Sequence, residues 1–362
     1  MIYLDYQATT PLAPEAREAM LRWLGGPGSD TFGNPHSPHR MGRMAAAAVE
    51  HAREQVAALF PPGGRVIFTS GATEAINLAI KGTARASQAI AVSAIEHAAV
   101  LDCAHALREP TETVILPVDD QGLVDPHCTI PASVGLVAVM QVNNEIGTIQ
   151  PVEQLADAAH RAGALFLCDA VQGAGKLAPP AKADLIAVSA HKLYGPKGVG
   201  ALWVRDGVTL LPHMDGGGQE QGLRSGTLSP ALCAGFGAAA ALAVARRDED
   251  ATHVEALSAR ARNLFADWTL NGSADQRWHG NLNIRRDGLD VARLMSDCRS
   301  VMFSAGSACA SGSGRTSHVL AALGLSGAQA KCSIRLGFGR YTTAHDIEQA
   351  AQAIHAAAEA QQ

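Results

Sequence analysis

Ionisable side chains follow two short apolar runs in the middle of the chain. The runs are Ala164–Cys168 and Leu185–Ser189, and each has the length expected of a strand that is covered on both faces. Asp169 follows the first run, and His191 and Lys192 follow the second. Ligands of open α/β sheets bind just beyond the carboxyl ends of the strands, so an acid and a lysine are predicted to face one crevice.

Lys192 is one of only six lysines, which makes its position just after a buried strand unusual. A lysine placed there can form an imine with a carbonyl cofactor. Pyridoxal phosphate (PLP) needs such a lysine, a carboxylate that keeps its ring nitrogen protonated, and a separate site for its phosphate. Asp169 can be that carboxylate. On these two residues alone, a salt bridge between Asp169 and Lys192 is the alternative interpretation.

A third predicted strand, Arg65–Thr69, leads into a possible phosphate site. The helix Glu74–Lys81 begins after SGAT, in which Gly71, Ala72 and Thr73 offer backbone N–H groups and a hydroxyl. The start of a helix attracts anions because its first N–H groups lack intrahelical partners. A helix cap without any phosphate is the alternative.

Two more predicted strands also end in polar residues. The strand Ala89–Ser93 leads to His97, and the strand Gly135–Val142 leads to Asn144. A capping or surface role is the alternative for His97. All of these strands deliver polar groups to one edge of the sheet, and this repetition favours a binding site over structural accident.

Charge and cysteine spacing exclude several classes of function. The formal net charge is −5, and no basic run is interleaved with aromatic residues, so we expect no nucleic-acid partner. No apolar run approaches the roughly 20 residues of a membrane helix, so we expect a cytoplasmic protein without a membrane partner. The seven cysteines include no C-x-x-C pair, and His36 and His39 have no third ligand nearby, so we expect free thiols and no metal.

The length of 362 residues predicts two lobes around one shared cleft. We expect a large α/β domain over residues 14–249, with a mostly parallel sheet that Ala201–Arg205 joins as an antiparallel strand. Residues 1–13 together with 250–362 are expected to form a smaller α/β domain. The charged stretch Arg246–Asp250 is the predicted boundary, and a helix over Glu255–Thr269 is expected to follow it.

Two glycine-rich segments and one arginine complete the candidate residues. We expect Met214–Leu228 to be ordered only by contact with another surface, such as the cleft of a dimer partner. Ser304–Ser317 is expected to be a mobile loop whose one nucleophile is Cys309. Arg335 follows a strand-like run and is a candidate clamp for a carboxylate.

Taken together, these motifs resemble a known family of enzymes. They resemble, in the same order and over nearly the whole chain, motifs of the cysteine desulfurases of the NifS/IscS type. The motifs in this sequence are YLDYQATTP, FGNPHSPHRMG, FTSGATEAINLAIKG, IEHAAVL, VNNEIGTIQP, DAVQGAGKL, SAHKLYGPKGVGAL, GGGQEQGLRSGTL, SAGSACASG and SIRLGFGRYTT. The long G-S-A-C form of the loop resembles group I of that family. The resemblance implies the aminotransferase-like fold of PLP enzymes (fold type I, class V), a homodimer, and conversion of L-cysteine to L-alanine with sulfur left on the enzyme as a persulfide.

The resemblance also implies roles for individual residues. Lys192 is similar to the Schiff-base lysine, Asp169 to the partner of the pyridine nitrogen, and Gln172 to a donor to the ring oxygen. His97 is similar to the residue that stacks on the ring and moves protons. Cys309 matches the cysteine that accepts the sulfur.

The remaining implied roles concern the phosphate and the substrate. The residues that resemble the phosphate site are Gly71, Ala72, Thr73, Ser189 and His191, with Thr227 reaching it from the other subunit. Asn144 contributes to the cofactor site and, with Arg335, resembles the site of the substrate carboxylate.

Other functions remain compatible with parts of this pattern. Another enzyme of the same fold, an aminotransferase or a selenocysteine lyase, is the nearest alternative, and a non-catalytic sulfur-trafficking protein is a more distant one. A thiol such as that of Cys309 has no use in transamination. The expected acceptor of the sulfur is an iron–sulfur scaffold or another thio-cofactor protein. Housekeeping members of the family have a tail beyond the GRYTT helix that helps to dock the scaffold, so we expect either that partner or its mode of docking to differ here.

Overall fold

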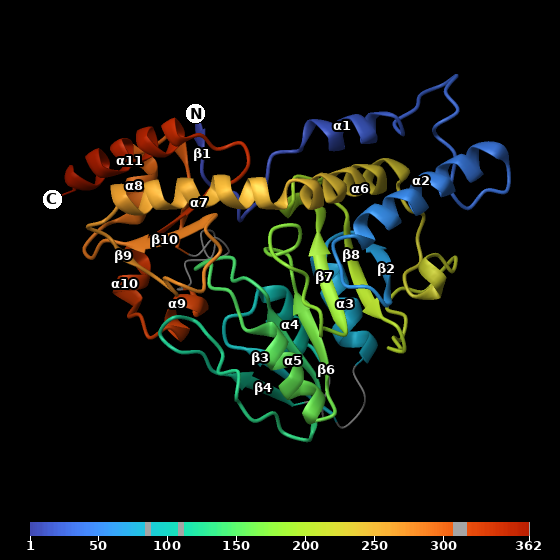
Figure 1. The fold of residues 1–362 in the computed structure, drawn as a ribbon, viewed down its shortest axis with the longest axis horizontal. Coiled ribbons are helices and arrows are strands. Elements are labelled where there is room, and N and C mark those ends of the chain that lie inside the picture. Colours follow the sequence, from blue (N-terminus) through green and yellow to red (C-terminus); the bar gives the residue numbers. More distant parts are fainter. Residues whose placement is uncertain (84–87, 108–111, 307–316, 362) are drawn as a thin grey trace.

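A seven-stranded sheet forms the centre of the larger part of the molecule (Figure 1). The computed structural model describes residues 1–83, 88–107, 112–306 and 317–361, so Cys309 lies outside the described residues. All neighbouring strands are parallel except at β8, which is antiparallel to both of its neighbours. The predicted α/β class, with a mostly parallel sheet and an antiparallel Ala201–Arg205, is therefore confirmed. In spatial order the strands are β2 (Gly64–Thr69), β8 (Gly200–Arg205), β7 (Leu185–Ser189), β6 (Leu165–Asp169), β5 (Val134–Met140), β3 (Ala89–Ser93) and β4 (Thr113–Leu116).

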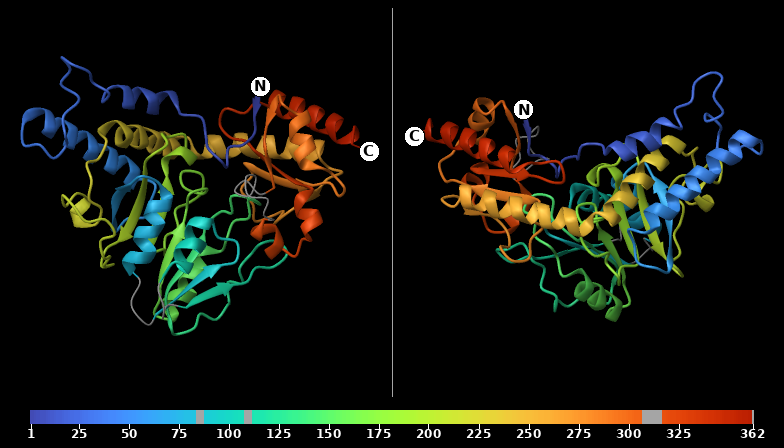
Figure 2. Two further views of the ribbon diagram at one scale, coloured as in Figure 1. Left: turned by 180° about the vertical axis from the view of Figure 1, so that it is seen from behind. Right: turned by 45° about the horizontal axis from the view of Figure 1, so that its top comes forward.

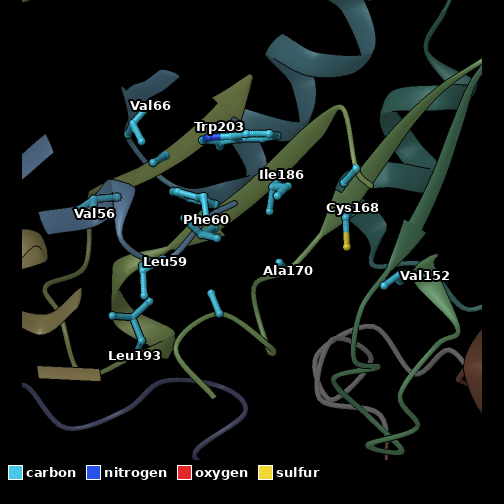
Figure 3. Close-up of a cluster of buried hydrophobic side chains, with 14 of the residues drawn as sticks. Val56, Leu59, Phe60, Val66, Val152, Cys168, Ala170, Ile186, Leu193 and Trp203 are labelled. Atoms are coloured by element: carbon cyan, nitrogen blue, oxygen red, sulfur yellow. The ribbon is translucent and has the colours of Figure 1, made fainter. Parts of the chain in front are cut away.

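Helices cover both faces of this sheet, which explains why its strands are apolar throughout. In β2, Val66 and Phe68 face one hydrophobic cluster and Ile67 faces the other. Phe60 stacks on Trp203 of β8 in the first cluster, with the ring centroids 6.3 Å apart (Figure 3). The first cluster receives α2 (Arg40–Ala57), α5 (Val152–Arg161) and α6 (Pro230–Ala245), and the second receives α3 (Ala72–Thr83) and α4 (Ala98–His105).

The C-terminal part has a small antiparallel sheet and its own hydrophobic cluster. The N-terminal residues join this part, because β1 (Ile2–Tyr3) pairs in parallel with β11 (Val301–Met302), and both termini lie on this side (Figure 2). The antiparallel sheet has the order β12 (Ser304–Ala305), β13 (Ser333–Gly337), β10 (Asn281–Arg285) and β9 (Thr269–Leu270). The helices of this part are α7 (Arg247–Leu264), α8 (Val291–Asp297), α9 (His318–Ala322), α10 (Gly327–Lys331) and α11 (Ala344–Glu359).

The charged stretch after α6, Arg246–Asp250, is helical from Arg247 onward. Only Arg246 separates α6 from α7, and the two helices run across the molecule nearly in line (Figure 1). The acidic residues Asp248, Glu249 and Asp250 lie in the first turn of α7, where they complement the positive end of the helix dipole. The predicted helix Glu255–Thr269 therefore begins eight residues earlier, and β9 takes its predicted end.

Contacts within the chain hold much of the glycine-rich segment Met214–Leu228, in which a partner's surface was expected to supply the order. The Glu220 carboxylate forms a buried pair with the Arg53 guanidinium, with N–O distances of 2.7 and 2.8 Å. It also accepts the backbone N–H of Phe68 at 2.7 Å. These bonds stabilise the positive φ angles of Glu220 and Gln221, which are 50° and 58°. The helix α1 (Pro14–Leu21) precedes α2.

Among the described residues, no helix combines the length and the apolar character that crossing a membrane requires.

Candidate functional site

A cavity of about 470 Å³ lies at the carboxyl ends of the parallel strands and extends to β13. Its size is within the range of small-molecule and cofactor sites. Most of the site residues predicted from sequence line it: Gly71, Ala72, Thr73, His97, Asn144, Asp169, Gln172, Ser189, His191, Lys192 and Arg335. The carboxyl-end rule for parallel sheets therefore brings these groups together as expected.

The start of α3 forms one end of the cavity. Its first N–H groups have no partners inside the helix and attract an anion. The Glu74 carboxylate fixes the turn, because it accepts the Ser70 N–H at 2.7 Å and pairs with Arg224 at 2.6 Å. Close packing requires glycine at position 200, since a Cβ atom there would lie 2.7 Å from the Cα of Gly71.

Ser189 and His191 face the same end of the cavity from the end of β7. The Nδ1 atom of His191 lies 3.1 Å from the hydroxyl oxygen of Thr9. Burial lowers the pKa of His191 to about 4, and the charges of Lys192 and Lys197 add to this effect. The imidazole is therefore neutral near pH 7, and it can hydrogen-bond an anion without carrying a charge.

Asp169 lies in the middle of the cavity and is buried. Its Oδ1 atom accepts the N–H of Val171 at 2.9 Å. Burial raises the pKa of Asp169, while the hydrogen bond from the Val171 N–H and the positive charge of Lys192 act in the opposite direction. A cationic group in the cavity would favour the ionised carboxylate further, so Asp169 suits a protonated ring nitrogen.

His97 lies on the cavity wall and also caps a helix. Its Nδ1 atom accepts the N–H of Ala99 at 3.1 Å, as the N-cap of α4. His97 therefore caps α4 and also lines the cavity. Since Nδ1 is an acceptor, the proton of the neutral ring is on Nε2.

Lys192 and Gln172 share a backbone acceptor that was not predicted. The Lys192 Nζ atom donates to the carbonyls of Gln7 and Ala8, at 2.5 and 2.8 Å. The amide of Gln172 donates to the same Gln7 carbonyl at 3.0 Å. An amide carries a second N–H, so Gln172 can still donate to a ring oxygen. Gln7 lies in the motif YLDYQATTP but is not among the site residues predicted from the sequence.

Arg335 lines the cavity from β13 and is only 1% exposed. Its Nη2 atom pairs with Asp5 at 2.6 Å, and its Nη1 atom donates to the Asn144 carbonyl at 3.0 Å. Ser304 donates to the same oxygen of Asp5 at 2.9 Å. A guanidinium held in this way can receive a carboxylate in a fixed orientation. Asp5 also lies in YLDYQATTP, and only its contact with Arg335 reveals its role.

Among the predicted residues that the structure describes, Thr227 is not part of this cavity. Thr227 is exposed and does not line the cavity of its own chain, while Cys309 is outside the described residues. The Nδ1 atom of His39 accepts the N–H of Gly42 at 3.2 Å and caps α2. In the described part of the chain, no three or more His, Cys, Asp or Glu residues form a group that could hold a metal ion.

The sequence matches the model of one protein family, aminotransferase class-V, over residues 2–350. The chain belongs to this family. It is 41% identical to the cysteine desulfurase IscS of Rickettsia bellii, over 98% of this chain and 90% of that protein. It is 44% identical to the cysteine desulfurase IscS of an Anaeromyxobacter species, over 96% of this chain and 90% of that protein.

Solved structures support membership of the class-V family. A NifS-like protein has a TM-score of 0.90 at 31% identity and covers 98% of both chains. The structure described as SspA in complex with cysteine has a TM-score of 0.82 at 32% identity, covering 95% of this chain and all of the other. The predicted fold, aminotransferase-like fold type I, is therefore confirmed, and so is the predicted cofactor, since desulfurases of this class depend on PLP.

The residues of the cavity fit PLP. The start of α3, with Ser189 and the neutral His191, suits the phosphate, and the buried Asp169 suits the ring nitrogen. The Lys192 amine lies in the same cavity and can bind the aldehyde carbon. An anion site, an acid and an amine in one cavity are the three groups that this cofactor requires.

Proposed function

We propose that the protein is a PLP-dependent cysteine desulfurase, which converts L-cysteine to L-alanine and transfers the sulfur to Cys309. One observation carries the proposal: a single cavity joins the Lys192 amine, the buried Asp169 carboxylate and the start of α3 to an arginine held for a carboxylate. The relatives named cysteine desulfurase, which match nearly the whole chain, support the choice of substrate.

Each wall of the cavity has its own task in this proposal. Gly71, Ala72 and Thr73 of the α3 start, with Ser189 and His191, bind the phosphate of PLP. Asp169 holds the ring nitrogen protonated, Gln172 donates to the ring oxygen, and His97 lies against the ring. Asn144 and Arg335 orient the carboxylate of L-cysteine.

When bound, PLP withdraws electrons from the α-carbon of an amino acid. The Lys192 Nζ atom, held by the carbonyls of Gln7 and Ala8, moves a proton at that carbon. The thiolate of Cys309 attacks the substrate sulfur, so that an S–S bond forms as the C–S bond breaks. The bonding electron pair stays on carbon, which is then protonated. L-Cysteine and one thiol thus give L-alanine and one persulfide, with no external oxidant.

We also propose a homodimer in which Thr227 of each subunit completes the phosphate site of the other. The exposure of Thr227 on its own chain supports this arrangement, and a fully active monomer in sedimentation would contradict it.

We propose domains at 14–249 and at 1–13 with 250–362, in line with the separate C-terminal hydrophobic cluster. The unpaired cysteines of the described residues favour a reducing, cytoplasmic location. The sulfur acceptor would be an iron–sulfur scaffold or a related protein.

Replacement of Cys309 tests the proposed function. The holoenzyme with Cys309→Ser is expected to bind PLP and L-cysteine but to release almost no alanine, because no thiol can accept the sulfur. The matched control is Cys332→Ser, which changes a partly exposed cysteine that the structure describes and should leave turnover intact. Alkylation of the persulfide and mass spectrometry locate the sulfur. Sulfur on Cys332 with turnover by Cys309→Ser would contradict the proposal, and so would amino transfer to a keto acid.

A further inference from the structure

Both ends of the segment that contains Cys309 are held by the same turn. The structure describes Gly306 before this segment and Ser317 after it. The Ser317 hydroxyl donates to Oε2 of Glu145 at 2.5 Å in a buried contact. The Asn283 amide donates to the Glu145 carbonyl at 3.0 Å and to the Gly306 carbonyl at 3.4 Å. The Ser317 end of the segment therefore contacts Glu145 directly, and the Gly306 end is linked to Glu145 through Asn283.

The contact at Ser317 is part of a well-connected helix start. The same hydroxyl that donates to Glu145 accepts the N–H of Leu320 at 3.0 Å, as the N-cap of α9. The next residue, His318, bonds through Nε2 to the carbonyl of Glu96 at 2.9 Å. Because a carbonyl only accepts, this Nε2 carries the proton. The C-terminal end of the segment is thus fixed to the two turns that precede His97 and follow Asn144.

The contact at Gly306 is equally well supported. The N–H of Gly306 donates to the Ser333 carbonyl on β13 at 2.7 Å. Asn283 is fully buried, and its Oδ1 atom accepts from the Asn271 amide at 2.8 Å, which fixes the direction of its own N–H groups. A Cβ atom at position 306 would lie 2.8 Å from the Cβ of Ser333, so glycine permits this approach.

These contacts connect the segment to the substrate end of the cavity. Glu145 follows Asn144, which lines the cavity and whose carbonyl accepts from Arg335 at 3.0 Å. Cys309 is three residues after Gly306 in the sequence. Three residues of chain span at most about 11 Å, so the place where Gly306 is held limits where the thiol can act.

We propose that Glu145 and Asn283 are positioning residues for the transfer of sulfur to Cys309. They hold Gly306 and Ser317, the two ends of the segment, against the corner of the cavity that binds the substrate carboxylate. This inference rests on the proposed function, because it assumes that Cys309 is the sulfur acceptor. Glu145 itself acts only through the segment ends.

The test compares substitutions at the two sides of the buried contact. In the holoenzyme, Ser317→Ala and Glu145→Ala are each expected to slow persulfide formation on Cys309 at least tenfold at saturating L-cysteine. Binding of L-cysteine, followed by the absorbance of the bound cofactor, should change by less than twofold for Ser317→Ala. Trypsin should cleave after Arg315, inside the segment, several times faster than in the wild type, because an anchor is lost. Glu145→Gln keeps an acceptor oxygen for Ser317 and should recover most of the rate.

Ser326→Ala is the matched control. Ser326 is the N-cap of the neighbouring five-residue helix α10, and its capping partner is Gln329. Its replacement removes a similar cap without touching Glu145, and it should leave both readouts unchanged. Wild-type rates of persulfide formation in both Ser317→Ala and Glu145→Ala would overturn the proposal, as would an equal slowing by Ser326→Ala. A wild-type enzyme that forms no persulfide on Cys309 would instead overturn the proposed function, while cleavage by trypsin would still test the anchor.

Discussion

The two walls of the cavity are built in different ways. The sheet wall consists of Asp169, Ser189, His191 and Lys192, each of which is part of a parallel strand or follows it by at most three residues. The neighbouring strands are in register, with Met140 opposite Asp169 and Asp169 opposite Ala187. Backbone hydrogen bonds between strands therefore set the positions of these side chains.

The C-terminal wall, where Arg335 lines the cavity and is held by Asp5 and Ser304, depends on contacts between side chains. Arg335 and Asp5 are 330 residues apart in the sequence, and they meet because β1 crosses to the C-terminal part. The positions of such paired side chains are not fixed by backbone hydrogen bonds between strands, so the loss of one partner is not compensated. We infer that the sheet wall tolerates the loss of single contacts, whereas the C-terminal wall depends on each of them.

The largest expected effect concerns two lysines near the sheet wall. The Nζ atom of Lys176 lies 5.8 Å from the centre of the Trp278 ring, and burial, together with the charge of Lys192, lowers the pKa of Lys176 to about 7. Part of Lys176 is therefore neutral near pH 7 and is a second nucleophilic amine, although it lines a separate pocket. We expect PLP to be linked to the lysine at the strand end. Lys192→Ala should therefore abolish the covalent link to the cofactor, and Lys176→Ala should retain it.

Borohydride reduction followed by peptide mapping checks this prediction. The cofactor should be fixed to Lys192 in the wild type and in Lys176→Ala. Cofactor on Lys176 in the wild-type protein would show that position at the strand end does not define the active amine.

A smaller effect is expected at the C-terminal wall. Arg335→Ala should raise the KM for L-cysteine about 100-fold, because a charged hydrogen bond is worth about 1.5–3 kcal/mol and each 1.4 kcal/mol is a factor of ten. Asp5→Ala leaves the arginine in place but removes the pair that orients it, so we expect a rise of about tenfold. Steady-state kinetics measure both values.

Asp30→Ala is the control for the loss of an ion pair. Asp30 pairs with Arg40 at the surface, where both side chains are mostly exposed, and its removal should leave the KM unchanged. An unchanged KM in Asp5→Ala would mean that Arg335 keeps its orientation without its partner. The proposed contrast between the two walls would then be wrong.

The difference between the walls also explains what the sequence could predict. Short apolar runs followed by polar residues predicted the place of Asp169 and Lys192, because parallel strands bring their carboxyl ends to one edge. Asp5, Gln7 and Glu145 escaped prediction because their roles come from long-range contacts, which periodicity and spacing do not encode. Arg246–Asp250 was predicted only as a domain boundary, because a dense run of charges does not by itself reveal that it forms the first turn of a helix.

The smallest expected effect concerns Glu96, a buried carboxyl group behind the sheet wall. Its Oε1 atom accepts from the Ser93 hydroxyl at 2.5 Å and from the Met140 N–H at 2.8 Å. Its Oε2 atom has no hydrogen-bond partner among the described residues. Burial raises the pKa of Glu96 to about 8 from an ordinary value of 4.5, and the charge of Asp169 adds to the rise.

This raised pKa predicts how the stability of the protein depends on pH. Between pH 4.5 and 8 the folded state keeps the proton of Glu96 and the unfolded state loses it, so the folded state binds more protons. The free energy of unfolding therefore falls as the pH rises through this window, by at most about 1.4 kcal/mol per pH unit. The side chain of Glu96→Gln has no proton to lose. The free energy of unfolding of this variant should therefore increase relative to that of the wild type from pH 5 to 8, and the difference should stay constant above pH 8. Thermal unfolding of both proteins at a series of pH values measures the difference, and Glu54→Gln, at a side chain that is 81% exposed, is the control. A difference that stays constant from pH 5 to 9 would show that Glu96 is ionised throughout, and that the sheet wall accommodates a second buried charge beside Asp169.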